Sequence, residues 1–246
     1  MSALAKLCQQ VEGEYRIQSA PPLIVRLPVE EHPEMKEVLQ VAIAGYEDTL
    51  PVELREVLNR HWFADFARKV VGVGSVGTEA FVLLLMSDTQ GQPLFLQIKE
   101  AQESVLAPYA GASIYEHQGE RVVAGQRLMQ AAGDPFLGWT TAVGSDRATP
   151  KQYYVRQLRD MKGDMDIPAM KPRQLERYAA LCGWALARAH ARTGRAPMIA
   201  GYLGSSDRFE RAIERFSIAY ADQNEDDHHR VARAVADGEL PTLTED

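Results

Sequence analysis

The stretch Val70-Val-Gly-Val-Gly-Ser-Val-Gly-Thr-Glu-Ala-Phe-Val-Leu-Leu-Leu-Met86 decides the fold class, because it sets three glycines directly before a short apolar run. Gly72, Gly74 and Gly77 form the pattern Gly-x-Gly-x-x-Gly. In a dinucleotide-binding domain the same pattern opens a helix, whose N-terminus meets the phosphates. Here the residues that follow are β-branched, aromatic and leucine-rich, which favours a strand. The glycines are therefore predicted to form a turn between two strands.

A lysine at the end of the next apolar run extends this pattern. Leu94 to Ile98 follows a turn cluster, and Lys99 ends the run. Strand, glycine turn, strand, turn and a strand with a terminal lysine is the order of the nucleotide-covering hairpin in a protein-kinase-like fold. In that fold the glycine turn, here with Ser75, brings backbone amides to phosphate oxygens, and the lysine adds a point charge. An ordinary three-stranded meander, with Lys99 reaching solvent, remains the alternative.

Kinase-like geometry also requires a glutamate that pairs with this lysine. Glu116 and Glu120 are the candidates, since a helix is predicted over residues 116–131. Glu120 lies closer to the body of that helix and is included among the nucleotide-site residues. Alternatively, each is a solvated first-turn glutamate that the helix dipole favours.

The rest of the chain predicts an α+β, protein-kinase-like architecture in three parts. Residues 1–65 form a helical and extended segment, with helices at 2–10, at 33–50 and from residue 51, and an edge strand or packed loop after Pro21-Pro22. Residues 66–160 form a small lobe of five antiparallel strands with one inserted helix. Residues 161–246 form a helical lobe with long helices at about 172–193 and 206–237.

Composition limits the possible partners. The chain has 246 residues, a net charge of -7 and a pI of about 5.5, which argues against nucleic acid as a partner. No apolar run approaches the roughly 20 residues of a membrane span, and no signal peptide is visible. The two cysteines, Cys8 and Cys182, have no metal-ligand spacing. We therefore expect a cytoplasmic protein without a membrane partner.

The carboxylates of a kinase active site are missing where the usual order would place them. Phosphoryl transfer needs an aspartate near the acceptor hydroxyl, and an asparagine and a second aspartate for metal. Residues 189–197, where the first aspartate would fall, contain none, and no Asp-Phe-Gly follows. The run from Asp222 to His229 is either a solvated helix face or a site for a divalent cation. We therefore assign no catalytic residue and no metal ligand.

Several blocks in order resemble a bacterial family, the domain-of-unknown-function family 2252. They are Val71–Thr78, Pro93–Ala101, Gly119–Gln130, Asp134–Trp139, Tyr154–Lys162, Cys182–Arg192 and Tyr220–His228. The resemblance covers nearly the whole chain. It implies a kinase-like fold related to small-molecule phosphotransferases, with ATP and Mg²⁺ as cofactors and a small molecule of unknown identity as phosphate acceptor.

The resemblance also implies a rearranged order of motifs. In the family, a Gly-Asp-x-His-x-x-Asn loop and an Asp-Phe-Asp segment precede the glycine loop, as in a circularly rearranged kinase, and this sequence contains neither. The chain thus resembles the C-terminal portion of the family. We expect the nucleotide-binding portion of a phosphotransferase, incomplete or inactive alone. A non-catalytic kinase-like binding or interaction module is the alternative.

Overall fold

The computed structural model describes residues 3–70, 77–88, 91–143, 149–158 and 165–240. The chain divides into two compact units, Met1–Ala189 and His190–Asp246, and each is described by itself. The described residues form an α+β structure with a six-stranded antiparallel sheet and a separate two-stranded hairpin.

The six-stranded sheet has the order β3-β4-β5-β6-β8-β7, and each neighbouring pair is antiparallel. β5 and β6 lie at its centre, which explains their nearly continuous apolar sequences, because both of their faces are covered. The strands are β3 (Ile24–Arg26), β4 (His61–Lys69), β5 (Ala80–Ser87), β6 (Pro93–Glu100), β7 (Gly138–Val143) and β8 (Pro150–Gln157).

The predicted number of five strands was wrong, because β3 adds a sixth strand at the edge beside β4. Pro21-Pro22 stands directly before β3 and outside the paired residues, as expected for prolines at a sheet edge. The helix predicted at residues 2–10 is also too long. The helix α1 (Ala3–Leu7) ends where β1 (Cys8–Val11) begins, and β1 pairs with β2 (Glu14–Ile17). The turn between them has Glu12 and Gly13 at φ 53 and 89, the backbone of a tight hairpin.

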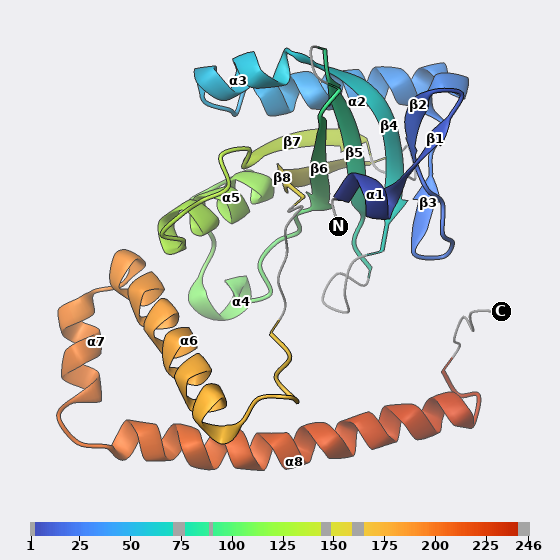
Figure 1. The fold of residues 1–246 in the computed structure, drawn as a ribbon. Coiled ribbons are helices and arrows are strands. Elements are labelled where there is room, and N and C mark those ends of the chain that lie inside the picture. The colour runs from blue at the N-terminus through green and yellow to red at the C-terminus, as the bar shows by residue number, and fades with distance from the viewer. Residues whose placement is uncertain (1–2, 71–76, 89–90, 144–148, 159–164, 241–246) are drawn as a thin grey trace. The chain divides into compact units, whose positions relative to one another are not determined.

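Two apolar clusters cover the two faces of the sheet. The helices α2 (Pro33–Glu47) and α3 (Val52–Leu58), with the short 3₁₀ helix η1 (Val29–Glu31), pack on one face (Figure 1). Their buried side chains meet those of the central strands: Leu39, Tyr46, Leu50, Leu58, Phe66, Leu83, Leu85, Leu94 and Leu96. The cluster on the other face joins the β1–β2 hairpin to the sheet through Ile17, Ala64, Ala67, Val82, Leu84, Met86 and Phe95.

Between β6 and β7 lie the one-turn helix α4 (Ala107–Ala110) and the longer helix α5 (Gln118–Met129). α5 packs on β7 and β8, and Gly119 in its first turn makes the close approach possible. A Cβ atom added at Gly119 would stand 2.3 Å from the carbonyl oxygen of Tyr153 and 2.8 Å from Cβ of Trp139. Only a residue without a side chain fits there.

We expect Gly119→Ala to lower the free energy of unfolding by about 2–3 kcal/mol, since the new methyl group forces α5 off β8. Gly125→Ala in the same helix is the matched control, because nothing lies within 4 Å of its added Cβ. Alanine is the better helix former, so the control gains up to about 1 kcal/mol. Urea unfolding of both variants measures the difference. Equal stabilities would show that α5 does not pack as described.

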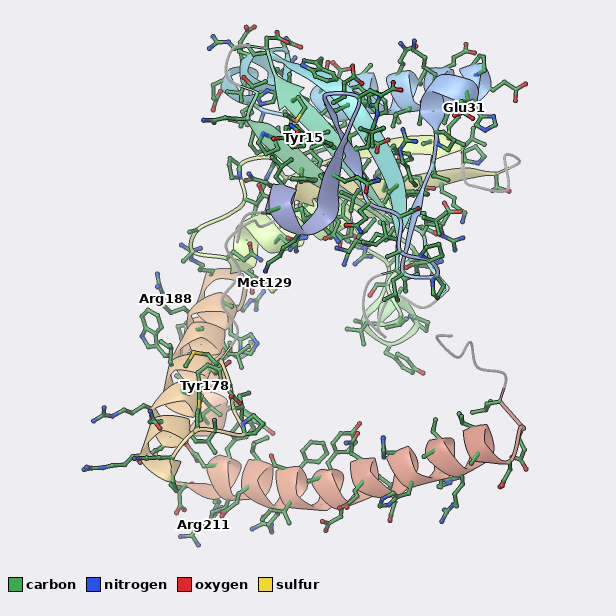
Figure 2. All side chains as sticks on the ribbon, turned by 45° about the vertical axis from the view of Figure 1, so that its right-hand side comes forward. Tyr15, Glu31, Met129, Tyr178, Arg188 and Arg211 are labelled. Atoms are coloured by element: carbon green, nitrogen blue, oxygen red, sulfur yellow. The ribbon has the colours of Figure 1, made fainter. Side chains whose placement is uncertain are left out.

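The C-terminal helices are α6 (Pro172–Thr193), α7 (Ala196–Leu203) and α8 (Arg208–Ala236). The ranges predicted for the two long helices are confirmed to within two residues. α7 was not predicted, because it is short, although Pro197 in its first turn and Gly204 at φ 66 after its end are ordinary helix boundaries. Figure 2 shows the side chains of these helices as sticks, among them Tyr178, Arg188 and Arg211. No helix in the described part of the chain is long and apolar enough to cross a membrane.

Candidate functional site

Three basic side chains share one face of the six-stranded sheet. Lys99 on β6 stands directly opposite Ala80 on β5 and Tyr154 on β8. Residues opposite each other in a ladder point to the same face, as do residues two apart along a strand. Arg156 on β8 is two residues from Tyr154 and therefore lies on the same face as Lys99.

Lys69 joins this group from the other side of β5. The register pairs Ala67 with Val82, which lies on the Lys99 face two residues from Ala80. Lys69 is two residues beyond Ala67 and is the last residue of β4 before the glycine turn. We call Lys69, Lys99 and Arg156 the basic face. It lies where β4 and β6 end.

The environment of the basic face disfavours its positive charges. Burial lowers the pKa of Lys99, and the nearby guanidinium of Arg156 lowers it further. Burial alone lowers the pKa of Lys69. Within the described ranges no carboxylate forms an ion pair with any member of the basic face. An anion bound here would relieve the repulsion between Lys99 and Arg156.

The structure describes only some of the residues predicted for the nucleotide site. Gly72, Gly74 and Ser75 lie outside the described residues. Gly77 is at φ 82, a left-handed backbone that glycine adopts without strain, and it stands just before β5. Lys99 lies at the end of a central strand, as expected.

Glu120 forms no ion pair with Lys99 and lies in the first turn of α5. Its backbone N–H donates to Nδ1 of His117 at 3.3 Å, so that His117 caps the helix. Burial lowers the pKa of His117, and the charge of Glu120 opposes that shift. This places Glu120 near His117, at the position of a first-turn glutamate.

A network of charged side chains, not foreseen from the sequence, anchors the start of β5. Tyr153 donates from its hydroxyl to Glu79 at 2.6 Å, and Lys151 forms ion pairs with Glu79 at 3.3 Å and Glu100 at 3.2 Å. The carboxylate of Glu100 also accepts the backbone N–H of Glu79 at 2.9 Å. The side chains of both glutamates are only 8% exposed. The network therefore fixes the chain just after the glycine turn.

Glu100 makes this network dependent on pH. Burial alone would raise its pKa, but hydrogen bonds from Gln102, from the Glu79 N–H and from Lys151 lower it below its ordinary 4.5. A carboxylate with a lowered pKa stabilises the folded state at pH values above its ordinary pKa, and that stability is lost as pH falls through the lowered value.

We expect Glu100→Gln to lower the free energy of unfolding at pH 7 by about 1–3 kcal/mol, because it weakens buried hydrogen bonds. The difference from the wild-type protein should shrink as pH falls below 4.5 and through the lowered pKa, where Glu100 of the folded wild type itself becomes protonated. Denaturant unfolding between pH 7 and pH 3 measures this. A difference that stays constant with pH would contradict a charged Glu100 in the network.

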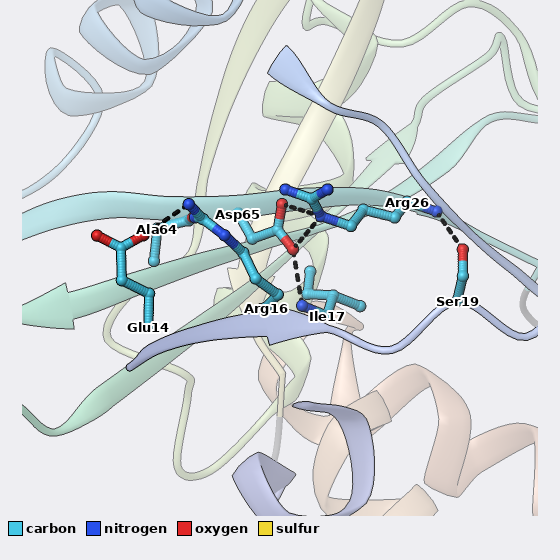
Figure 3. Close-up of polar contacts among 7 residues, drawn as sticks. All are labelled: Glu14, Arg16, Ile17, Ser19, Arg26, Ala64 and Asp65. Carbon is cyan, nitrogen blue, oxygen red and sulfur yellow. Dashed lines mark hydrogen bonds and ion pairs between the residues drawn. The ribbon is translucent and has the colours of Figure 1, made fainter. Parts of the chain in front are cut away.

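Another buried carboxylate, Asp65, connects the elements beside the β3 edge of the sheet (Figure 3). The Nε–H of Arg26 donates one bifurcated hydrogen bond to both carboxylate oxygens of Asp65 on β4, at 2.9 and 2.8 Å, and the N–H of Ile17 donates to the same carboxylate at 2.7 Å. Asp65 follows a register shift after Phe63, which turns its side chain toward β2 and β3. One carboxylate thus ties the hairpin and the edge strand to β4, the strand that leads to the glycine turn.

Comparison with known proteins identifies the family. Residues 1–234 match the model of a family described as "Uncharacterized protein conserved in bacteria (DUF2252)". The chain belongs to the DUF2252 family. No curated protein and no solved structure matches it. In this DUF2252 protein, the described residues contain no group of three or more His, Cys, Asp or Glu side chains that could hold a metal ion, and the Asp222–His229 run is part of α8.

Proposed function

We propose that this DUF2252 protein binds a nucleotide through its phosphates, as the nucleotide-binding portion of a kinase-like small-molecule phosphotransferase. The observation that carries the proposal is the basic face, three cations on one face of the sheet without a carboxylate partner among the described residues. Partly buried cations that repel each other are stabilised by a bound anion. The predicted glycine turn at residues 72–77, of which the structure describes only Gly77, would supply the backbone that phosphate-binding loops use.

The residues present fit the phosphates of ATP. Lys99 would meet them as a point charge, and Arg156 offers a planar guanidinium that can bind two phosphate oxygens at once. Gly77 permits a close approach of backbone to ligand at the end of the turn. Mg²⁺ bound with ATP would neutralise phosphate charge during transfer to the acceptor.

The order of elements supports the kinase-like part of the proposal. From β4 to β8 the chain forms five strands whose neighbours in the sheet are antiparallel, and α5 lies between β6, which carries Lys99, and β7. The kinase-like small lobe has five strands with a helix inserted after the lysine strand. The missing contact between Lys99 and Glu120 favours a second candidate, a non-catalytic module that binds a nucleotide or another anion.

Calorimetry with ATP and Mg²⁺ tests the proposal, with adenosine as the matched ligand that has no phosphate. We expect ATP to bind and adenosine to bind at least tenfold more weakly, because the basic face contacts only the phosphates. Absence of ATP binding would overturn the proposal. ATP binding without any turnover, across a panel of small-molecule hydroxyl and amine acceptors, would favour the non-catalytic module.

A further inference from the structure

An apolar cavity of about 480 Å³ lies between α2 and the sheet. α2 forms one wall of the cavity, and strands β4 to β8 form the other. Six side chains that line it are Met35, Val38, Ile43, Phe81, Ile98 and Val143. Small-molecule sites usually have apolar walls and a volume of roughly 300–1,000 Å³, and this cavity has both properties.

This cavity is separate from the basic face. Phe81 pairs with Ile98 in the ladder, and these two residues alternate with Ala80 and Lys99 along β5 and β6. Neighbours along a strand point to opposite faces of the sheet. The cavity and the basic face therefore lie on opposite sides of the same two strands.

The hydroxyl groups in the cavity wall already have partners in the protein. Thr140 donates to the carbonyl of Ala42 at 2.8 Å, and Tyr46 donates to the carbonyl of Phe136 at 2.7 Å. Tyr153 donates to Glu79 in the network described above. The wall therefore presents mainly apolar surface to a ligand, so the buried part of a ligand is expected to be apolar.

One cation completes the lining. Arg68 on β4 lines the cavity, is exposed to solvent, and forms no ion pair with any carboxylate that the structure describes. Glu34 is the other charged lining residue, and it has an interaction of its own. A guanidinium beside an apolar cavity is complementary to a ligand with an apolar body and a carboxylate head, which it can bind through two hydrogen bonds.

We propose that the cavity between α2 and the sheet binds an amphipathic carboxylate, a small acid with an apolar chain or ring. Its apolar body fills the space lined by Val38, Phe81 and Ile98. Its carboxylate pairs with Arg68 at the solvent side. Binding at this site does not require a nucleotide, so the proposal can be tested independently of nucleotide binding at the basic face.

Calorimetry with decanoate and with decanol tests the site on the full chain. We expect both to bind, with decanoate the tighter ligand. Arg68→Gln should weaken decanoate about tenfold or more and leave decanol unchanged, because only the charged hydrogen bonds are lost. Arg60→Gln is the control, since Arg60 is also exposed but does not line the cavity.

Filling the cavity supplies the second test. Val38→Trp should weaken both ligands at least tenfold, while Val41→Trp on the exposed side of α2, where Val41 is 64% exposed, should weaken neither. If Val38→Trp fails to fold, the Arg68→Gln result still decides. No binding of either ligand to the wild type overturns the proposal. A dimer of the wild type that Val38→Trp dissociates, without decanoate binding, would instead assign the cavity to a second copy of the chain.

Discussion

Replacing Lys99 with methionine should weaken ATP binding by about tenfold to a hundredfold, the effect of losing a hydrogen bond to a charged group. Methionine keeps much of the length of the lysine side chain and removes its charge. Because the pKa of Lys99 is already lowered by burial and by Arg156, the uncharged residue should not destabilise the protein. Calorimetry with ATP and Mg²⁺ measures the change in affinity, and thermal unfolding checks the fold.

Lys36→Met is the matched control for this substitution. Lys36 is exposed on α2, which packs on the face of the sheet opposite Lys99. It should leave ATP affinity unchanged, apart from a small effect of one unit of net charge. If Lys99→Met and Lys36→Met lose the same amount of ATP affinity, the net charge of the protein and not the basic face determines nucleotide binding.

Asp65→Ala should lower the free energy of unfolding by about 3–5 kcal/mol, because it removes a buried carboxylate that pairs with the half-buried Arg26. The side chain of Asp65 is only 1% exposed, and that of Arg26 is 29% exposed. The backbone N–H of Ile17 also loses its acceptor. Urea unfolding measures the loss, and a fall of less than about 1 kcal/mol would contradict the role of Asp65.

Arg26→Ala separates the contribution of the Asp65–Arg26 ion pair from that of the hydrogen bond between Ile17 and Asp65. Asp65 keeps the hydrogen bond from Ile17 in this variant. The double variant Asp65→Ala/Arg26→Ala should be more stable than the sum of the single losses predicts, since neither charge is then left without its partner. Additive losses would mean that the two side chains do not depend on each other.

The central strands could be predicted from the sequence because local chemistry determines them. The apolar runs Ala80–Ser87 and Pro93–Glu100 are too short for helices and are bounded by turn residues. The position of Lys99 near the end of a strand follows from where the second apolar run ends. The apolar spacing of Leu4, Leu7 and Cys8 suits a helix, so the sequence predicts one that runs too far. In the structure the turn at Glu12-Gly13 forms a hairpin, and the pairing of β1 with β2 makes Cys8 part of a strand.

The candidate site could be predicted only in part, because much of it depends on long-range pairing. Arg156 lies beside Lys99 only because of the register of β8 against β6, which no local pattern indicates. Lys151 meets Glu79 and Glu100 for the same reason. The position of Glu120 depends on the cap that His117 forms at the start of α5, which no local pattern indicates. The apolar cavity depends on how α2 packs, which no local pattern indicates.

The most direct test of the proposed phosphate site is the pKa of Lys99 itself, measured by NMR on lysine-labelled protein with and without tripolyphosphate. Without ligand the pKa should lie below the ordinary value of 10.5, because of burial and Arg156. Tripolyphosphate should raise it, since a bound anion stabilises the ammonium form. A pKa of Lys99 that does not change at saturating tripolyphosphate would contradict phosphate binding at the basic face.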